Sequence, residues 1–257
     1  MSFETLLYEV QSGLARLTLN RPDQRNGITN RMVREMTEAL ETAATDDSIR
    51  VLVLTGAGRS FCPGADLNHF TDGGPDDTLR AQDFRVTALL HEIPAVTVAA
   101  INGACAGAGL GWALACDLRV MTQSAKCNTA FLDVAVAGDM AIPWSLPRLI
   151  GASRAKDLSF LPRRVTADEA LTIGMVARVF PDDVFHEQTE QLVQDLMDKS
   201  PTALKGLKAN YLAAERMGLA DFVDYEAERH LRIAASSDTK EAFRAFVEKR
   251  KPSWTDS

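Results

Sequence analysis

The stretch from Val96 to Asp117, VTVAAINGACAGAGLGWALACD, constrains the fold more than any other part of the chain. An apolar run is followed by an Asn-Gly pair and then by glycines and alanines that pass into a helical pattern. This order predicts a strand, a tight turn and a helix N-terminus. A second stretch, Arg50 to Leu67 (RVLVLTGAGRSFCPGADL), has the same order. Because glycine lets other groups approach the backbone closely, we expect the two loops to face each other and to hold one atom of a ligand between them.

Strand and helix patterns alternate in the segments around these loops, which predicts an α/β fold. The run Val51 to Leu54 is apolar at every residue, as in a strand buried on both faces of a parallel sheet. From Asn30 onward, apolar residues recur at helical spacing. Further strands are expected at Leu6 to Val10, Leu14 to Leu19, Val96 to Ile101, Leu118 to Met121, near Thr129 to Phe131 and near Val176 to Val179, with a helix from about Leu79 to His91.

Two segments differ in character from this alternating part. Residues His69 to Thr78 are rich in glycine, acidic and hydroxyl residues and predict a mobile loop. Beyond Pro181 only helical patterns remain, at Val184 to Leu196, Thr202 to Arg216, Asp221 to Ala235 and Asp238 to Lys249. Asp238 and Glu241 have the spacing of a cap at the start of the last helix. We expect this helical tail to be a lid or an interface between subunits.

Composition limits the classes of function. The chain has 257 residues, 46% of them hydrophobic, enough for one domain with an appendage. A net charge of −7 argues against nucleic acid as a partner. We expect a cytoplasmic protein that does not bind membranes, because the sequence shows no signal peptide and no membrane-spanning apolar run. Cysteine and histidine spacings predict no metal site, and Cys62 and Cys105 are expected to be packing residues.

The two glycine-rich stretches do not match the common nucleotide-binding motifs. The pattern G-x-G-x-x-G fails, because Gly56 and Gly58 are followed by Phe61 where the third glycine would stand. The second stretch lacks the Gly-Lys-Ser/Thr ending of a phosphate-binding loop. From spacing alone two interpretations stay open. The loops are ordinary tight turns packed with small residues, or they form an oxyanion hole in which two backbone N–H groups hold a negative oxygen.

Four segments of the chain resemble the enoyl-CoA hydratase/isomerase (crotonase) family, in the family's order and over nearly the whole length. They are FCPGADL at Phe61 to Leu67, INGACAGAGLGWALACD at Ile101 to Asp117, WSLPRLIG at Trp144 to Gly151 and DTKEAFRAFVEKRKPSW at Asp238 to Trp254. The resemblance implies a crotonase-like spiral of ββα units at residues 1–195. It also implies an all-helical part at residues 196–257 that serves oligomerisation, giving a homotrimer or a dimer of trimers.

The same resemblance implies the substrate and several site residues. Family members act on acyl-CoA thioesters, so coenzyme A is part of the substrate and no separate cofactor is expected. The oxyanion hole would consist of the N–H groups of Ala65 and Ala108. Candidate substrate-binding residues are Asp66 and Leu67 beside the first loop, Arg25, Arg59 and Lys249 for the phosphates of coenzyme A, and Phe131 and Trp144 in the pocket wall.

The chain departs from the pattern of the family's hydratases, which place one glutamate just after the second glycine loop and another in the next Pro-Glu segment. Here Gly111 and Phe131 occupy those positions. Hydration requires groups that activate a water and deliver a proton. Because the usual pair of carboxylates is absent, ordinary hydration is not expected.

Asp139 is the one acid at a position where the family places chemistry. It precedes WSLPR by the spacing of isomerase members, and dehalogenase members use an aspartate nearby as nucleophile. Its apolar neighbours are expected to raise its pKa towards that of a useful base. The alternatives are a solvated loop aspartate or a helix N-cap before Ala141. Asp66 and Asp117 also belong to family motifs and are expected to fix loops.

The resemblance and its departures together favour double-bond isomerisation of an enoyl-CoA, with Asp139 as the acid and base. Three alternatives stay open at this point. Asp139 attacks the substrate covalently, as in dehalogenase-like or thioester-hydrolysing members. The protein is an enoyl-CoA hydratase, as the family's general description suggests. Or it is a catalytically lapsed member kept for binding an acyl-CoA, the RNA-binding role of some relatives being disfavoured by the acidic net charge.

Overall fold

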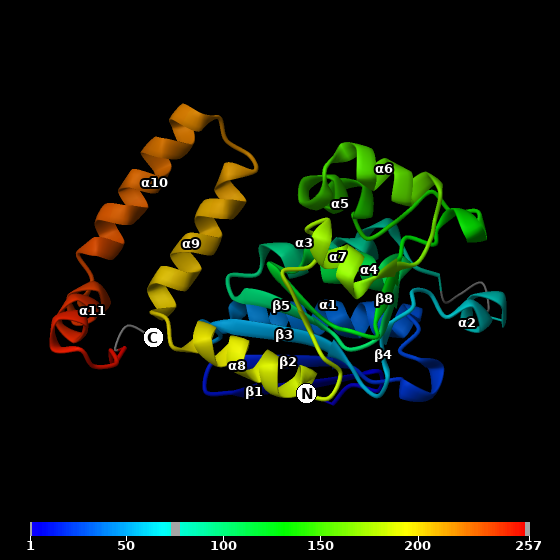
Figure 1. The fold of residues 1–257 in the computed structure, drawn as a ribbon, viewed down its shortest axis with the longest axis horizontal. Coiled ribbons are helices and arrows are strands. Elements are labelled where there is room, and N and C mark those ends of the chain that lie inside the picture. Colours follow the sequence, from blue (N-terminus) through cyan, green and yellow to red (C-terminus); the bar gives the residue numbers. More distant parts are fainter. Residues whose placement is uncertain (1, 73–77, 255–257) are drawn as a thin grey trace.

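The computed structural model describes residues 2–72 and 78–254. A six-stranded sheet forms the centre of the molecule (Figure 1). The strands lie in the order β1-β2-β3-β5-β7-β10, and only the β1–β2 pair is antiparallel. Their bounds are β1 (Leu6–Gln11), β2 (Leu14–Leu19), β3 (Val51–Gly56), β5 (Val96–Ile101), β7 (Leu118–Thr122) and β10 (Arg178–Phe180). The hairpin and the parallel strands are as the sequence predicts, except that the last strand begins at Arg178.

Both faces of this sheet are covered by helices. On one face, Leu52 and Leu54 belong to the main core with α1 (Asn30–Thr45), α3 (Val86–Glu92) and α4 (Gly107–Ala115). On the other face, Val51 and Val53 pack with α8 (Phe185–Met197). The continuous apolar run of β3 is therefore explained, because alternate side chains enter two different cores.

A second sheet brings the two glycine-rich stretches together. It has the order β4-β6-β8-β9, with β4 (Ser60–Cys62), β6 (Ala104–Ala106), β8 (Lys126–Asn128) and β9 (Val165–Thr166). Each strand has only two or three residues, too few for a recognisable alternation of side chains. The strand expected near Thr129 to Phe131 is misplaced, because the nearest strand, β8, ends at Asn128, before that segment begins.

Two local predictions need correction. The helix expected from Leu79 to His91 is a 3-10 helix, Ala81–Arg85, followed by α3. The Asp83 carboxylate accepts a hydrogen bond from the backbone N–H of Arg80 and so favours a tight first turn. The expected mobile loop begins instead with a helix, α2 (Leu67–Asp72), and its next part, residues 73–77, lies outside the described residues. The remaining helices described in this part of the fold are α5 (Ile142–Ile150), α6 (Ala152–Phe160), α7 (Ala167–Thr172) and the 3-10 helices Pro22–Gln24 and Leu132–Val134.

The C-terminal helices form an arm that projects from one end of the molecule (Figure 1). They are α9 (Pro201–Ala214), α10 (Leu219–Ala234) and α11 (Ser237–Glu248). The expected cap by Asp238 and Glu241 is wrong, because the helix begins earlier. Ser236 is the N-cap and accepts a hydrogen bond from Thr239 N. Asp238 is buried and accepts one from Ser200 Oγ at 2.7 Å, which ties α11 to the start of α9.

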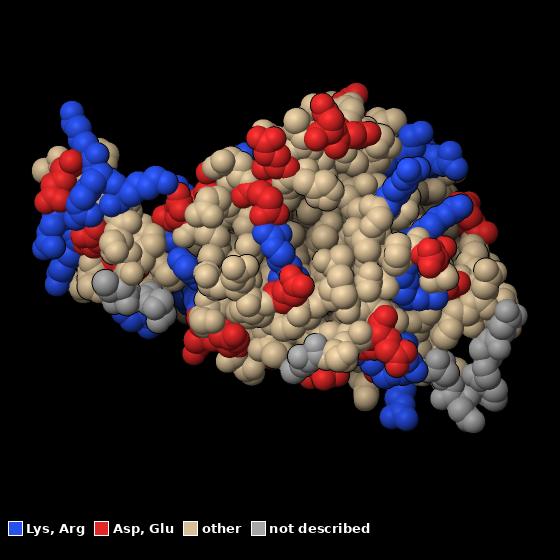
Figure 2. Space-filling view, turned by 90° about the horizontal axis from the view of Figure 1, so that it is seen from below, with Lys and Arg blue, Asp and Glu red and all other residues tan. Residues whose placement is uncertain are grey.

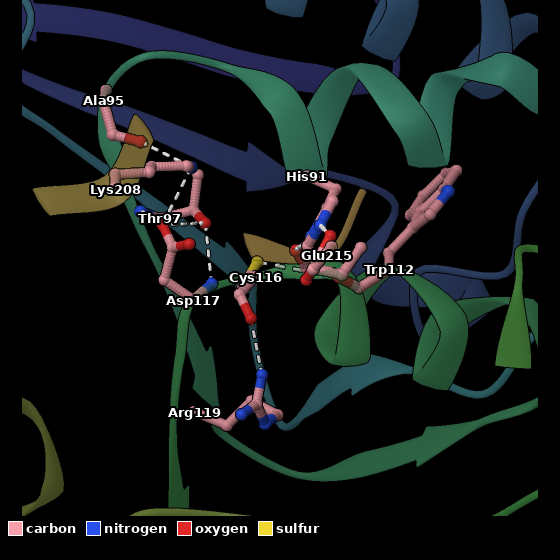
Figure 3. A network of polar contacts seen from close by, with 10 residues as sticks. His91, Ala95, Thr97, Trp112, Cys116, Asp117, Arg119, Lys208 and Glu215 are labelled. Atoms are coloured by element: carbon pink, nitrogen blue, oxygen red, sulfur yellow. Dashed lines mark hydrogen bonds and ion pairs between the residues drawn. The ribbon is translucent and has the colours of Figure 1, made fainter. Parts of the chain in front are cut away.

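A buried polar network joins the arm to the core (Figure 3). Lys208 of α9 is 4% exposed, lies 2.8 Å from the Asp117 carboxylate and donates to Ala95 O at 2.8 Å. The same carboxylate accepts hydrogen bonds from Thr97 N and Oγ1, at 2.7 and 2.9 Å. Asp117 therefore fixes the loop after α4, as the sequence predicts. In the part of the chain that the structure describes, no helix is both long and apolar enough to cross a membrane.

Candidate active site

The two glycine-rich stretches touch at Gly64 and Gly107. A Cβ atom on Gly64 would lie 3.1 Å from Ala106 O, and one on Gly107 would lie 3.7 Å from Gly64 Cα. Both residues have positive φ, +101° and +50°, a conformation that glycine adopts without strain. These two glycines directly precede Ala65 and Ala108, the expected oxyanion-hole residues, so the contact brings the two alanines to one place.

The backbone N–H of Ala65 points away from its own neighbours. A single parallel bridge joins Ile28 to this loop, through Ile28 N to Gly64 O at 2.8 Å and Asp66 N to Ile28 O at 2.9 Å. Such a bridge uses both polar groups of Ile28 and leaves those of Ala65 directed to the opposite side. Within the described residues, Ala65 N donates no hydrogen bond, and the residue is exposed.

Ala108 lies in the first turn of α4, where helix geometry leaves N–H groups without intrahelical partners. The N-cap is Ala106, which has no side-chain oxygen and makes no cap hydrogen bond. Ala108 itself is 5% exposed. The open N–H groups and the helix dipole together favour a negative charge at this end of α4.

Asp139 lies in the loop before α5 with part of its carboxylate buried. Among the described residues, its Oδ1 atom has no hydrogen-bond partner. Burial raises the pKa of Asp139 to about 6, since the charged form loses hydration. The residue is not the N-cap of α5, a position that Ala141 occupies. A carboxylate with this pKa can accept and return a proton near neutral pH.

Contacts on both sides of Asp139 connect its loop to the second glycine-rich stretch. A Cβ on Gly138 would lie 3.7 Å from the Phe131 ring, and one on Gly107 would lie 3.9 Å from the same ring. On the other side, Met140 packs directly on Gly111 of α4. Phe131 and Gly111 thus both lie beside the site, at the positions where hydratases of the family are expected to carry glutamates.

Two cavities adjoin the loop that holds Asp139. One, of about 320 Å³, is lined by Phe131, Gly138 and side chains of α5 and α6. The other, of about 530 Å³, is lined by Ala141, Trp144 and residues of α3. Trp144 is 39% exposed, with the Arg148 guanidinium stacked 3.9 Å from its ring centre. Phe131 and Trp144 thus each line a cavity next to the Asp139 loop, and these cavities have the size of small-ligand pockets, but Ala65, Ala108 and Asp139 line neither of them.

The expected coenzyme A contacts divide into two groups. Arg25 and Arg59 are exposed on loops beside the first glycine-rich stretch, where a Cβ on Gly58 would lie 3.3 Å from Pro22. Asp66 pairs with Arg21 at 2.8 Å and so fixes this loop, while Leu67 begins α2 and is 55% exposed. Arg21 was not predicted, although it stands in the same Arg-Pro-Asp-Gln-Arg segment as Arg25.

Lys249 does not share this location. It follows α11 at the end of the arm, and Figure 1 shows α11 and α2 at opposite ends of the long axis of the molecule. Figure 2 shows Lys and Arg side chains gathered on the arm, whereas both signs of charge are interspersed over the core. Within one chain, Lys249 therefore lies at the opposite end of the molecule from the helix that follows Ala65.

Several residues that shape the site escaped sequence reasoning. Thr87 donates a hydrogen bond to Met140 Sδ at 3.1 Å. Asn26 Nδ2 donates to Ala57 O and Ser60 O, at 2.9 and 2.8 Å, and so holds the first glycine-rich stretch. Their roles depend on contacts between distant segments, which no local pattern reports. The Cys62 thiol is fully buried, and burial raises its pKa to about 12, so it stays protonated, in agreement with a packing role.

The chain is similar to proteins of known activity over almost its full length. A model of the enoyl-CoA hydratase/isomerase family matches residues 9–257. The 1,2-epoxyphenylacetyl-CoA isomerase of Escherichia coli is 34% identical over 98% of each chain. A probable enoyl-CoA hydratase of Rhodobacter capsulatus is 33% identical over 99% of each chain. A crystal structure of an enoyl-CoA hydratase from Bacillus anthracis superposes with a TM-score of 0.92 at 28% identity, covering 99% of this chain and 100% of that one, which confirms the crotonase-like fold. The chain belongs to the enoyl-CoA hydratase/isomerase family.

Proposed function

We propose that this family member isomerises the double bond of an unsaturated acyl-CoA, with Asp139 as a single acid and base. The N–H groups of Ala65 and Ala108 hold the thioester oxygen. The observation that carries the proposal is the buried, unpartnered carboxylate oxygen of Asp139 and its pKa of about 6. A base in this state needs neither a second carboxylate nor a cofactor.

The reaction requires only a proton transfer. Asp139 removes a proton from C2 of a 3-enoyl-CoA, and the electrons move to the thioester oxygen, where the two N–H groups stabilise the negative charge. The C3–C4 double bond is then conjugated with this enolate. When Asp139 returns the proton to C4, the double bond lies between C2 and C3. Atoms and charge balance without any other reactant.

Hydration is less well supported by the residues around Asp139. Phe131 offers an apolar ring and Gly111 offers no side chain, so neither can bind or activate a water. The name of the Escherichia coli relative, an isomerase, agrees with the proposal, whereas the Rhodobacter relative is named a probable hydratase. The assignment must therefore come from measurement on this protein.

The test compares Asp139→Asn with Asp133→Asn. Because Asn cannot accept the proton, we expect kcat for bond migration in a 3-enoyl-CoA to fall by about 10²- to 10⁴-fold, with binding of the CoA ester nearly unchanged. Asp133 is exposed on the 3-10 helix Leu132–Val134 and provides the same substitution six residues away. Its variant is expected to keep wild-type turnover. Unchanged turnover of Asp139→Asn would contradict the proposal.

A panel of enoyl-CoA esters separates the remaining functions. Bond migration, hydration and release of free CoA are followed in parallel. An aspartyl ester trapped on Asp139 and seen by mass spectrometry, or release of CoA, would indicate nucleophilic attack. Water addition would indicate a hydratase, and silence in all three assays would favour an acyl-CoA-binding protein.

Self-association is part of the same proposal, with a homotrimer or a dimer of trimers as the expected state. The arm exposes large apolar side chains, among them Leu231, Phe243 and Phe246 at 70%, 70% and 85% exposure, which a second copy would cover. Only in such an assembly could Lys249 contribute to a coenzyme A site. Light scattering on the full chain measures the number of copies, and a monomer would contradict this part.

A further inference from the structure

Gly111 makes a contact that no other residue type allows. A Cβ atom at this position would lie 2.5 Å from Met140 Cβ and 2.6 Å from Met140 O. The second of these atoms belongs to the backbone and cannot rotate away. The backbone of the loop that carries Asp139 therefore rests directly on helix α4.

That loop is held in a conformation that ordinary residues rarely adopt. Met140 and Ala141 have φ values of 44° and 59°, both in the left-handed region. Such a conformation is retained where the surroundings enforce it. Met140 is 3% exposed, and its sulfur accepts the hydrogen bond from Thr87. Gly111 on one side and Thr87 on another thus fix the residue that follows Asp139.

Gly111 also belongs to the helix that carries one of the proposed oxyanion donors. Ala108 and Gly111 are three residues apart in α4, so they lie on neighbouring turns of the same face, about 4.5 Å apart along the axis. The contact at Gly111 therefore relates the loop of Asp139 directly to the N–H of Ala108.

We propose that Gly111 is a positioning residue for Asp139: its missing side chain lets Met140 seat on α4 and sets the place of the carboxylate relative to the oxyanion hole. This inference rests on the proposed function, since it gives Gly111 a role in proton transfer. Gly111 thus has a structural role in the reaction, in addition to standing where hydratases of the family are expected to carry a glutamate.

The main test is Gly111→Ala. We expect kcat to fall by about 100-fold with KM little changed, because the substrate still binds while the base is displaced by about 1 Å. The loop is also pushed towards solvent. Asp139 then regains hydration, and the acidic limb of the kcat–pH profile moves from about pH 6 to a lower pH.

Two further variants keep the test decisive if Gly111→Ala folds poorly. Thr87→Val removes the hydrogen bond to Met140 and leaves Gly111 unchanged. We expect it to lower kcat and to move the acidic limb of the kcat–pH profile to lower pH, both by less than Gly111→Ala does. Gly206→Ala is the matched control in the arm, where a Cβ would lie 2.5 Å from the flexible end of Ile233. It is expected to leave kcat and the limb unchanged.

The outcomes separate this inference from the proposed function. Folded Gly111→Ala protein with wild-type kcat and an unmoved limb would overturn the positioning role, even if Asp139→Asn is inactive. A loss of thermal stability alone, with an unmoved limb, would do the same and would assign Gly111 to packing. If Asp139→Asn keeps its activity, the proposed function itself fails, whatever Gly111→Ala shows.

Discussion

The two ends of helix α4 are built in opposite ways. At its start, the N–H groups around Ala108 have no cap, and the neighbouring contacts are made by glycines. Beyond its end, Asp117 accepts hydrogen bonds from Thr97 and pairs with Lys208, while Arg119 donates to Cys116 O (Figure 3). Arg119 also donates to Met175 O. One end keeps its donors unsatisfied, and the other satisfies its buried polar groups.

This difference shows how the molecule tolerates an unsatisfied site. Buried polar groups without partners destabilise a fold. The network at the far end supplies anchorage from β5, β7 and the arm, so the helix stays in place without a cap. Its open N–H groups then remain available for a negative oxygen. Substitutions at the open end, at the anchored end and at Asp139 perturb this difference in turn.

Among changes along α4, the largest effect is expected from Gly109→Ala at the open end. A Cβ there would lie 2.5 Å from Cys62 O and 2.6 Å from Cys62 Sγ, which forces α4 away from β4. Since Ala108 lies on α4 and Ala65 on the loop that follows β4, kcat should fall by about 10²- to 10³-fold, the loss seen when one oxyanion donor is removed. Turnover of the enoyl-CoA substrate is the measurement.

The control for this variant is Gly218→Ala. Gly218 caps α10 with a φ of −72°, and a Cβ there would be 3.8 Å from the nearest side chain atom, Asp221 Oδ2. We expect wild-type turnover from it. If Gly109→Ala turned over substrate at the wild-type rate, the distance between β4 and α4 would be irrelevant to the chemistry.

A smaller effect, and on stability rather than on turnover, is expected from Lys208→Met at the anchored end. The change leaves Asp117 and Ala95 O with fewer partners and should lower the free energy of unfolding by about 2 to 3 kcal/mol. Lys205→Met on the same helix is the control. Lys205 lies 3.9 Å from a fully exposed Asp47 carboxylate, so its loss should amount to less than about 1 kcal/mol.

Denaturant unfolding of both lysine variants, together with their turnover, tests whether the anchored end of α4 contributes to stability and not to the chemistry. We expect the Lys208→Met protein that remains folded to keep kcat within about twofold, because the site is at the other end of the helix. A large loss of kcat without loss of stability would show that the network takes part in the chemistry.

The smallest effect has the opposite sign and concerns Asp139. Burial raises its pKa from 3.8 to about 6, so the folded protein loses stability as the pH rises through this window. The rise corresponds to at most about 3 kcal/mol, which solvent screening of this partly exposed group reduces to about 1 to 2 kcal/mol. Asp139→Asn is therefore expected to be more stable than wild type at pH 7 by that amount. The gain should disappear below about pH 4. Thermal unfolding of both proteins at pH 7 and below pH 4 is the measurement, and a gain of the same size at both pH values would contradict the prediction.

The sequence predicted the elements whose patterns are long. The amphipathic helix α1, the apolar strands β3 and β5 and the helices of the arm follow from periodicity, and their bounds agree within a few residues. The second sheet was missed, because β4, β6, β8 and β9 have two or three residues each. Their pairing depends on where the glycine-rich turns bring the chain, and a short segment carries no sign of this.

The sequence predicted which residues belong to the candidate site, but not the contacts and backbone conformations that arrange them. Gly64, Gly107 and Gly111 are recognisable as glycines, but the atoms that would collide with a Cβ come from other segments. The left-handed backbone of Met140 and Ala141 has no sequence signal, because neither residue favours it. Lys249 was grouped with the site by resemblance, yet the arm carries it to the opposite end of the molecule.

The bridge between Ile28 and the Ala65 loop has a consequence for inheritance. It turns the main-chain N–H of Ala65 away from Ile28, where it can serve the proposed oxyanion hole, and every residue type except proline possesses that group. A site of this kind passes down a lineage with the course of the backbone, so its side chains can drift while the oxygen is still held. Descendants are then free to exchange one reaction for another by relocating a single carboxylate. A protein named isomerase and one named probable hydratase can accordingly each be about a third identical to this chain.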